Sequence, residues 1–198
     1  MYELHGSARS RAFRVLWLLE ELGVDYTHHA TKPRSAEIMA LNPLGKVPVL
    51  VTEGQVLTDS TAIMTYLADK HGALTYPAGT VERARQDAHT GFILDEIDSL
   101  LWTVAKHSFG LPEGLRVPAI KDAVREEFRI SAERLENRIE GPFLMGDQMT
   151  IADILAVHCL GWAIVAKFPM DRPALKEYAK PLRARAAYKA AQSSGQAA

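Results

Sequence analysis

The chain contains little cysteine, no excess of either charge and no long apolar run. A single cysteine among 198 residues excludes an intramolecular disulfide framework and a Cys-x-x-Cys centre. A formal net charge of −1 gives no basic field of the kind that binds nucleic acid. Apolar stretches such as 151–157 end well short of bilayer length, and the amino terminus lacks the pattern of a secretory signal. We therefore expect a cytoplasmic enzyme or binding protein with no nucleic-acid or membrane partner.

The first third of the chain alternates strand and helix patterns. Apolar residues recur at helical spacing after Arg11, which places Arg14 on the polar side of that helix, and Gly23 ends it. A turn at Glu53-Gly54 between two apolar runs predicts a β-hairpin. The expected order is βαβαββα, with elements at 2–5, 11–22, 26–29, 36–41, 47–52, 55–58 and 59–72.

The remainder of the chain has only helical patterns. A linker is expected at 74–79, which contains Pro77 and Gly79, so the predicted domains are 1–76 and 80–198. The second domain should be all-helical. Its expected helices are 80–106, 119–139, 151–167 and 174–187, with a break at 106–118, where two prolines and two glycines fall.

Pro48 stands at the start of the first hairpin strand. Proline cannot donate to a β-ladder, so it must occupy a strand start or a special site. If the Val47–Pro48 bond is cis, the N–H and C=O of Val47 turn outward and can pair with an extended peptide. The alternative is an ordinary trans proline that opens a strand.

Asp59-Ser60 begins a helix directly after the hairpin. Either side chain is expected there as an N-cap. The same pair could bind an α-amino-acid group, because Ser60 and the first helical N–H groups suit a carboxylate while Asp59 suits an ammonium. Thr150 and Asp153 form a capping box at a later helix start, which we assign to folding.

Arg9-Ser10-Arg11 precedes the first helix with a hydroxyl between two guanidiniums. Hydrogen-bond donors and positive potential converge there, which suits a thiolate, although Ser10 could instead be a plain N-cap. Cys159 lies mid-helix among apolar residues and is expected to be a buried structural thiol. The seven histidines have no metal-ligand spacing, because His28 and His29 in one strand would point to opposite faces; we expect no metal.

Four of these motifs in register resemble the glutathione transferase family. They are the Arg/Ser-rich loop with the helix Arg14–Gly23, Asn42-Pro43-x-Gly45-Lys46-Val47-Pro48, the Asp59-Ser60 helix start, and Gly146-Asp147-x-x-Thr150-Ile151-Ala152-Asp153. The resemblance covers nearly the whole chain. It implies a thioredoxin-like first domain, an all-helical second domain and a homodimer.

The resemblance also implies roles for individual residues in binding glutathione. Val47 and Pro48 match the segment that pairs with the cysteinyl backbone, and Asp59 and Ser60 match the pair that binds the γ-glutamyl group. Lys46 and Asn42 match positions near the glycyl end. Ser10 matches the residue facing the sulfur, with Arg9 and Arg11 adding charge and Ser7 an alternative. The expected pocket for a hydrophobic electrophile contains Ser7, Trp102, Thr103, Lys106 and His107.

The implied reaction is attack by the glutathione thiolate on a small electrophile, either conjugation or peroxide reduction. A free thiol has a pKa of about 8.5, so the protein must favour the anion. One charge-assisted hydrogen bond contributes roughly 1.5–3 kcal/mol, about one to two pKa units. The alternative is a non-catalytic glutathione-binding or ligand-carrier protein on the same fold.

Overall fold

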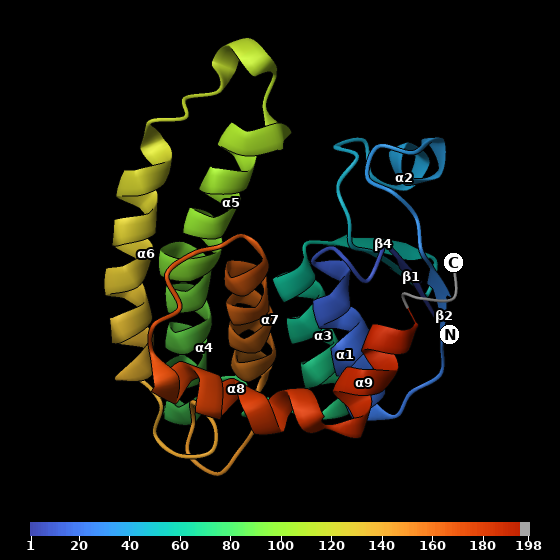
Figure 1. Ribbon diagram of the computed structural model, residues 1–198. Helices are drawn as coiled ribbons and strands as arrows, with labels where there is room; N and C mark the ends of the chain where they lie inside the picture. The colour runs from blue at the N-terminus through green and yellow to red at the C-terminus, as the bar shows by residue number, and fades with distance from the viewer. Residues whose placement is uncertain (195–198) are drawn as a thin grey trace. The chain divides into compact units, whose positions relative to one another are not determined.

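The computed structural model describes residues 1–194 (Figure 1). The chain forms two compact units. The first unit comprises Met1–Ala78 together with the segment from Pro181 onward, and the second comprises Gly79–Lys180. The boundary near 78 lies in the expected linker, but the expected second domain 80–198 ends earlier, at Lys180. Its last residues, 195–198, lie outside the described residues. Within the described part, no helix is long and apolar enough to cross a membrane.

The first unit contains a four-stranded mixed sheet in the order β2-β1-β3-β4. Strand β1 pairs with β2 in parallel and with β3 in antiparallel, and β3 pairs with β4 as the expected hairpin. The thioredoxin-like prediction is confirmed, with each element close to its expected place. The elements are β1 Tyr2–His5, α1 Ala12–Leu22, β2 Tyr26–His29, α2 Ala36–Leu41, β3 Val49–Thr52, β4 Gln55–Thr58 and α3 Ser60–His71.

The residues of β1 alternate between the two faces of the sheet. Tyr2 and Leu4 are buried, and the Tyr2 hydroxyl bonds His71 of α3 at 2.8 Å. His5 points to the other face, where its Nδ1 lies 3.0 Å from Glu37 of α2. Figure 1 accordingly shows α1 and α3 on one side of the sheet and α2 on the opposite side. This alternation follows from the two-residue period of a strand.

The helical segment expected at 174–187 is two helices, α8 (Pro173–Ala184) and α9 (Ala186–Ser193). Helix α9 belongs to the first unit because it packs on α1. The ring of Tyr188 meets Phe13 and Trp17 edge-on, with centroids 5.1 and 4.9 Å apart. Arg185 adds a bidentate ion pair to Glu21, at 2.6 and 2.7 Å. These contacts explain why the second domain ends before the expected residue.

The second unit is all-helical, as predicted. Its first helix continues past the expected end at Lys106, because π-helical turns interrupt but do not break it. The expected break at 106–118 therefore begins only after Gly110. The elements are α4 Val81–Ile93, η1 Leu94–Asp98, α5 Ser99–Ala105, η2 Lys106–Gly110, η3 Glu113–Leu115, α6 Ile120–Glu136 and α7 Ile151–Val165.

The predicted capping box at α7 is confirmed. Asp153 is fully buried and accepts the Thr150 N–H at 2.8 Å, the Leu144 N–H at 2.8 Å and the Tyr178 hydroxyl at 2.7 Å. Burial raises the pKa of this carboxyl, while the donors around it act in the opposite direction. The side chain thus joins α7, α8 and the preceding loop. Cys159 is buried, as expected.

Candidate active site

Val47 and Pro48 lie just before β3, outside the hydrogen-bonded ladder. The peptide bond between them is cis, and the ladder to β1 begins at Val49 opposite His5. Within residues 1–194, neither the N–H nor the C=O of Val47 forms a hydrogen bond. Val47 is half-buried, whereas Pro48 is buried. A peptide lying beside Val47 could therefore take up both backbone groups, as an added strand would.

The loop before Val47 is held by Asn42. The Asn42 side chain donates to the Lys46 carbonyl at 3.0 Å and accepts from the Leu44 N–H at 3.1 Å. Its backbone carbonyl accepts from Gly45 at 2.8 Å, and the residue is buried. Asn42 therefore positions the loop, whereas Lys46 has an exposed side chain that can meet a ligand.

Gly6 brings the loop after β1 into direct contact with Val47. Its φ of +135° lies in a region that side-chain-bearing residues rarely adopt. A Cβ placed there would lie 2.8 Å from the Ala12 Cβ and 3.0 Å from the Val47 Cβ. The Gly6 N–H donates to the His29 carbonyl at 2.9 Å, and His28 Nε2 donates to the Gly6 carbonyl at 2.8 Å. These two hydrogen bonds hold the loop at Gly6 against β2.

The two serines of the loop make different hydrogen bonds. The Ser10 hydroxyl donates to the Ser7 carbonyl at 2.7 Å and accepts from the Ala12 N–H at 3.1 Å, which is a capping arrangement. The Ser7 hydroxyl oxygen accepts from the Arg9 N–H at 3.2 Å. Its own proton has no acceptor in the described part of the chain. Ser7 therefore retains an unused donor, whereas the Ser10 proton is directed at a backbone carbonyl.

The start of α3 combines the capping and binding features expected of Asp59 and Ser60. Asp59 has a φ of +71° and is the N-cap: its Oδ1 accepts from the N–H groups of Thr61 at 2.9 Å and Ala62 at 3.0 Å. The capping role is confirmed. The Asp59 carboxylate is also exposed, and no acceptor among residues 1–194 takes the N–H or the hydroxyl proton of Ser60. This helix tip can hold a carboxylate and an ammonium side by side.

Arg14 is a component of this site that the sequence pattern did not reveal. It was expected on the polar side of α1, yet it is only 1 % exposed. Its Nη1 donates to the Ser60 hydroxyl oxygen at 3.2 Å. The Arg14 guanidinium thus occupies one of the two acceptor positions of the Ser60 hydroxyl and leaves its proton available to another acceptor. The sequence feature that could have indicated its burial is that Arg14 stands between the apolar residues Phe13 and Val15 of the helix.

The residues expected to line an electrophile pocket fall in both units. Ser7 lies in the first unit. In the second unit, Trp102 and Thr103 lie on α5 and Lys106 and His107 on η2, all half-buried. His107 Nδ1 accepts from the Val117 N–H at 3.0 Å, which holds the following loop. The pocket stays a prediction.

A cluster of possible metal ligands lies elsewhere on the sheet, although none was expected. Glu3, His5 and His29 place one ligand atom each within 4.8 Å of one another. Spacing along the chain could not reveal this set, because pairing of β1 with β2 brings His5 and His29 together.

Two family models match the chain. The model for the N-terminal domain of glutathione S-transferase matches residues 9–70, and the model for the C-terminal domain matches residues 100–186. Together they span most of the sequence.

Individual relatives agree with these matches. Mouse (Mus musculus) glutathione S-transferase theta-2 is 34 % identical over 133 residues, which cover 63 % of this chain and 53 % of that protein. The chain thus spans about half the length of the curated relatives it matches. A crystal structure of a glutathione transferase from Methylococcus capsulatus str. Bath is 28 % identical, with a TM-score of 0.87 over 99 % of both chains. A sphingomonad glutathione S-transferase solved with glutathione is 25 % identical, with a TM-score of 0.85 over 99 % of this chain and 100 % of that one. The chain therefore belongs to the glutathione S-transferase family.

Proposed function

We propose that this protein is a glutathione transferase, which binds glutathione in the first unit and activates its thiol for attack on a hydrophobic electrophile. The observation that carries the proposal is the unused backbone pair of Val47, which lies against the Gly6 loop. An extended peptide paired with Val47 would direct its side chain toward that loop and its hydroxyl groups.

Each part of glutathione has a matching group along this surface. The γ-glutamyl carboxylate would accept from the N–H and hydroxyl of Ser60, and its ammonium would pair with Asp59. The cysteinyl N–H and C=O would pair with Val47. The glycyl carboxylate would meet Lys46. Asn42 and Arg14 act as positioning residues, because they hold the loop and the Ser60 hydroxyl in place.

We assign the hydrogen bond to the sulfur to Ser7, with Ser10 as the residue that shapes the loop. A hydroxyl has one proton, and that of Ser10 is directed at the Ser7 carbonyl, whereas that of Ser7 has no acceptor in the described chain. The amino-terminal end of α1 and the charges of Arg9 and Arg11 add positive potential. One such charge-assisted bond contributes roughly 1.5–3 kcal/mol, which lowers the thiol pKa by about one to two units.

The reaction follows from the thiolate. In conjugation with 1-chloro-2,4-dinitrobenzene, a carbon–sulfur bond forms, chloride leaves and the thiol proton passes to solvent. Ser7 keeps its own proton throughout, because it stabilises the anion without attacking. In the first unit, the second substrate would lie against Ser7. We further propose a homodimer in the cytoplasm.

Binding and turnover test the proposal separately. Calorimetry should detect glutathione binding to the purified chain, and turnover should appear with 1-chloro-2,4-dinitrobenzene or with a panel of peroxides and isothiocyanates. Binding without turnover on every compound would favour a ligand carrier. Failure to bind glutathione would overturn the proposed function altogether.

A further inference from the structure

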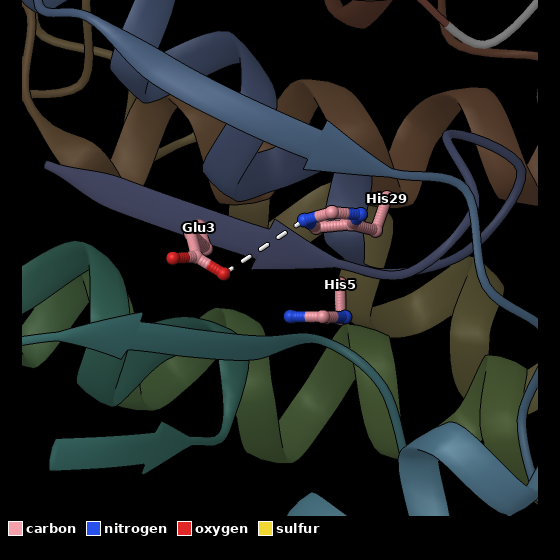
Figure 2. A group of neighbouring side chains, drawn as sticks. All are labelled: Glu3, His5 and His29. Carbon is pink, nitrogen blue, oxygen red and sulfur yellow. Dashed lines mark ion pairs between the residues drawn. The ribbon is translucent and has the colours of Figure 1, made fainter. Parts of the chain in front are cut away.

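We propose that the face of the sheet next to α2 binds a divalent transition-metal ion through Glu3, His5 and His29. Glu3 and His5 lie two residues apart on β1 and so share one face. His29 lies directly opposite His5 in the parallel pairing of β1 with β2. Figure 2 shows the two rings lying one over the other, with the Glu3 carboxylate beside them.

The three ligand atoms could share one ion once the ring of His29 turns out of its present stack on His5, in which the ring centroids lie 4.5 Å apart and the planes are 16° apart. The ligand atoms all lie within 4.8 Å of one another, and Glu3 Oε2 lies 3.9 Å from His29 Nε2. Metal–nitrogen distances near 2.0–2.1 Å in a tetrahedral site require ligand atoms about 3.3 Å apart. Glu3 is exposed and His29 half-buried, so both side chains can make this adjustment without disturbing the core. His5 is buried and would serve as the fixed ligand.

Glu37 supplies a second, independent feature of a metal site. Its Oε1 accepts from His5 Nδ1 at 3.0 Å, across from β1 to α2. This bond fixes the tautomer in which Nε2 of His5 carries a lone pair. A carboxylate that orients a histidine in this way commonly accompanies metal ligation. Figure 2 shows that both rings extend toward Glu3, so the bare nitrogen of His5 is on the ligand side.

The donor set indicates which metal binds. Two imidazoles and one carboxylate suit zinc, cobalt, nickel or copper, whereas magnesium and calcium prefer oxygen ligands alone. Three protein ligands leave further positions for water. We therefore propose that the ion is zinc and use cobalt as a spectroscopic substitute for it.

Metal binding at this place would stabilise the loop that carries Ser7. His5 directly precedes Gly6, and the Gly6 N–H donates to the carbonyl of His29. An ion shared by His5 and His29 thus ties together the two chains that anchor the loop, and through Glu37 it also ties α2 to the sheet.

Titration of the metal-stripped full-length chain tests the site. Calorimetry with zinc chloride should give one ion per chain, and thermal denaturation should show a rise in Tm with zinc. Cobalt should produce visible absorption bands. His29→Gln should lower zinc affinity at least tenfold, and Glu37→Gln should lower it by about 10- to 100-fold. His71→Asn removes an exposed histidine of the same unit and should leave zinc affinity unchanged.

The variants distinguish zinc binding at Glu3, His5 and His29 from non-specific zinc binding by other histidines. Absence of zinc binding at micromolar concentration would overturn the proposal. So would an unchanged affinity in His29→Gln, or an equal loss in His71→Asn. Circular dichroism of each metal-free variant checks folding, and Glu3→Gln provides a second ligand variant at an exposed position.

Discussion

The guanidinium of Arg14 in α1 donates to the hydroxyl oxygen of Ser60, the first residue of α3, over 3.2 Å. The two side chains are 1 % and 3 % exposed. This buried contact joins the two helices on one face of the sheet and fixes the residue that we assign to the γ-glutamyl carboxylate.

Arg14→Met should therefore affect stability and binding together. The variant keeps most of the apolar volume but leaves polar groups without a partner, so we expect a loss of about 2–4 kcal/mol in the free energy of unfolding. Glutathione affinity should fall as well, because the Ser60 hydroxyl loses its orientation. Urea denaturation and calorimetry measure the two effects. An equal stability loss in Arg9→Met, whose side chain is exposed, would contradict this account.

Asp59 allows its two roles to be separated. Asn caps helices about as well as Asp and tolerates a positive φ, so Asp59→Asn should retain stability while losing the ion pair to the ammonium. We expect glutathione binding to weaken roughly tenfold. Asp59→Ala should lose the same affinity and, in addition, about 1 kcal/mol of stability. Calorimetry measures the glutathione affinity of both variants, and urea denaturation measures their stability. An unchanged glutathione affinity in Asp59→Asn would show that the Asp59 carboxylate does not bind glutathione.

Local patterns predicted those parts of the fold that neighbouring residues determine. The hairpin at Glu53-Gly54, the αL end of α1 at Gly23 and the capping box of Thr150 with Asp153 each depend on residues a few positions apart. The residues at 47–48 and 59–60, which we propose as glutathione contacts, were singled out for the same reason, because each pair stands at a strand or helix start.

The sequence patterns did not predict features that depend on tertiary packing. The burial of Arg14 depends on α3, and the place of α9 in the first unit depends on Tyr188 reaching Phe13 and Trp17. The cluster of Glu3, His5 and His29 exists only because β1 and β2 pair in this register. The difference between Ser7 and Ser10 likewise depends on which carbonyl lies within reach.

His89 on α4 should make the stability of the protein sensitive to mild acid. Burial and the charge of Arg138 lower the pKa of this histidine below 6.5, and its Nδ1 is buried without a partner in the described chain. A lowered folded-state pKa contributes stability that is present above pH 6.5 and lost as the pH falls through the folded value. His89→Gln does not titrate. Its difference from wild type in the free energy of unfolding should therefore change between pH 7.5 and 5, by at most about 1.4 kcal/mol per pH unit. Urea denaturation at several pH values across this range measures the effect. If the free energies of unfolding of wild type and His89→Gln change with pH in parallel, the prediction is contradicted.

Asp153 should be among the most sensitive positions for stability. Asp153→Ala leaves the N–H groups of Leu144 and Thr150 and the hydroxyl of Tyr178 unpaired in the interior. We expect a loss of about 3–5 kcal/mol in the free energy of unfolding. Thr150→Ala, which removes one hydroxyl of the same box, should cost about 1 kcal/mol. Comparable losses in the two variants would show that the carboxylate network contributes little.

The pKa of the thiol of bound glutathione reports whether Ser7 stabilises the thiolate. Ultraviolet difference absorbance of the thiolate, titrated in wild type, Ser7→Ala and Ser10→Ala, reports the group that faces the sulfur. We expect a bound-thiol pKa below the free value of about 8.5 in wild type, raised by about one to two units in Ser7→Ala and nearly unchanged in Ser10→Ala. A wild-type pKa equal to that of free glutathione, or a rise in Ser10→Ala but not in Ser7→Ala, would contradict this expectation.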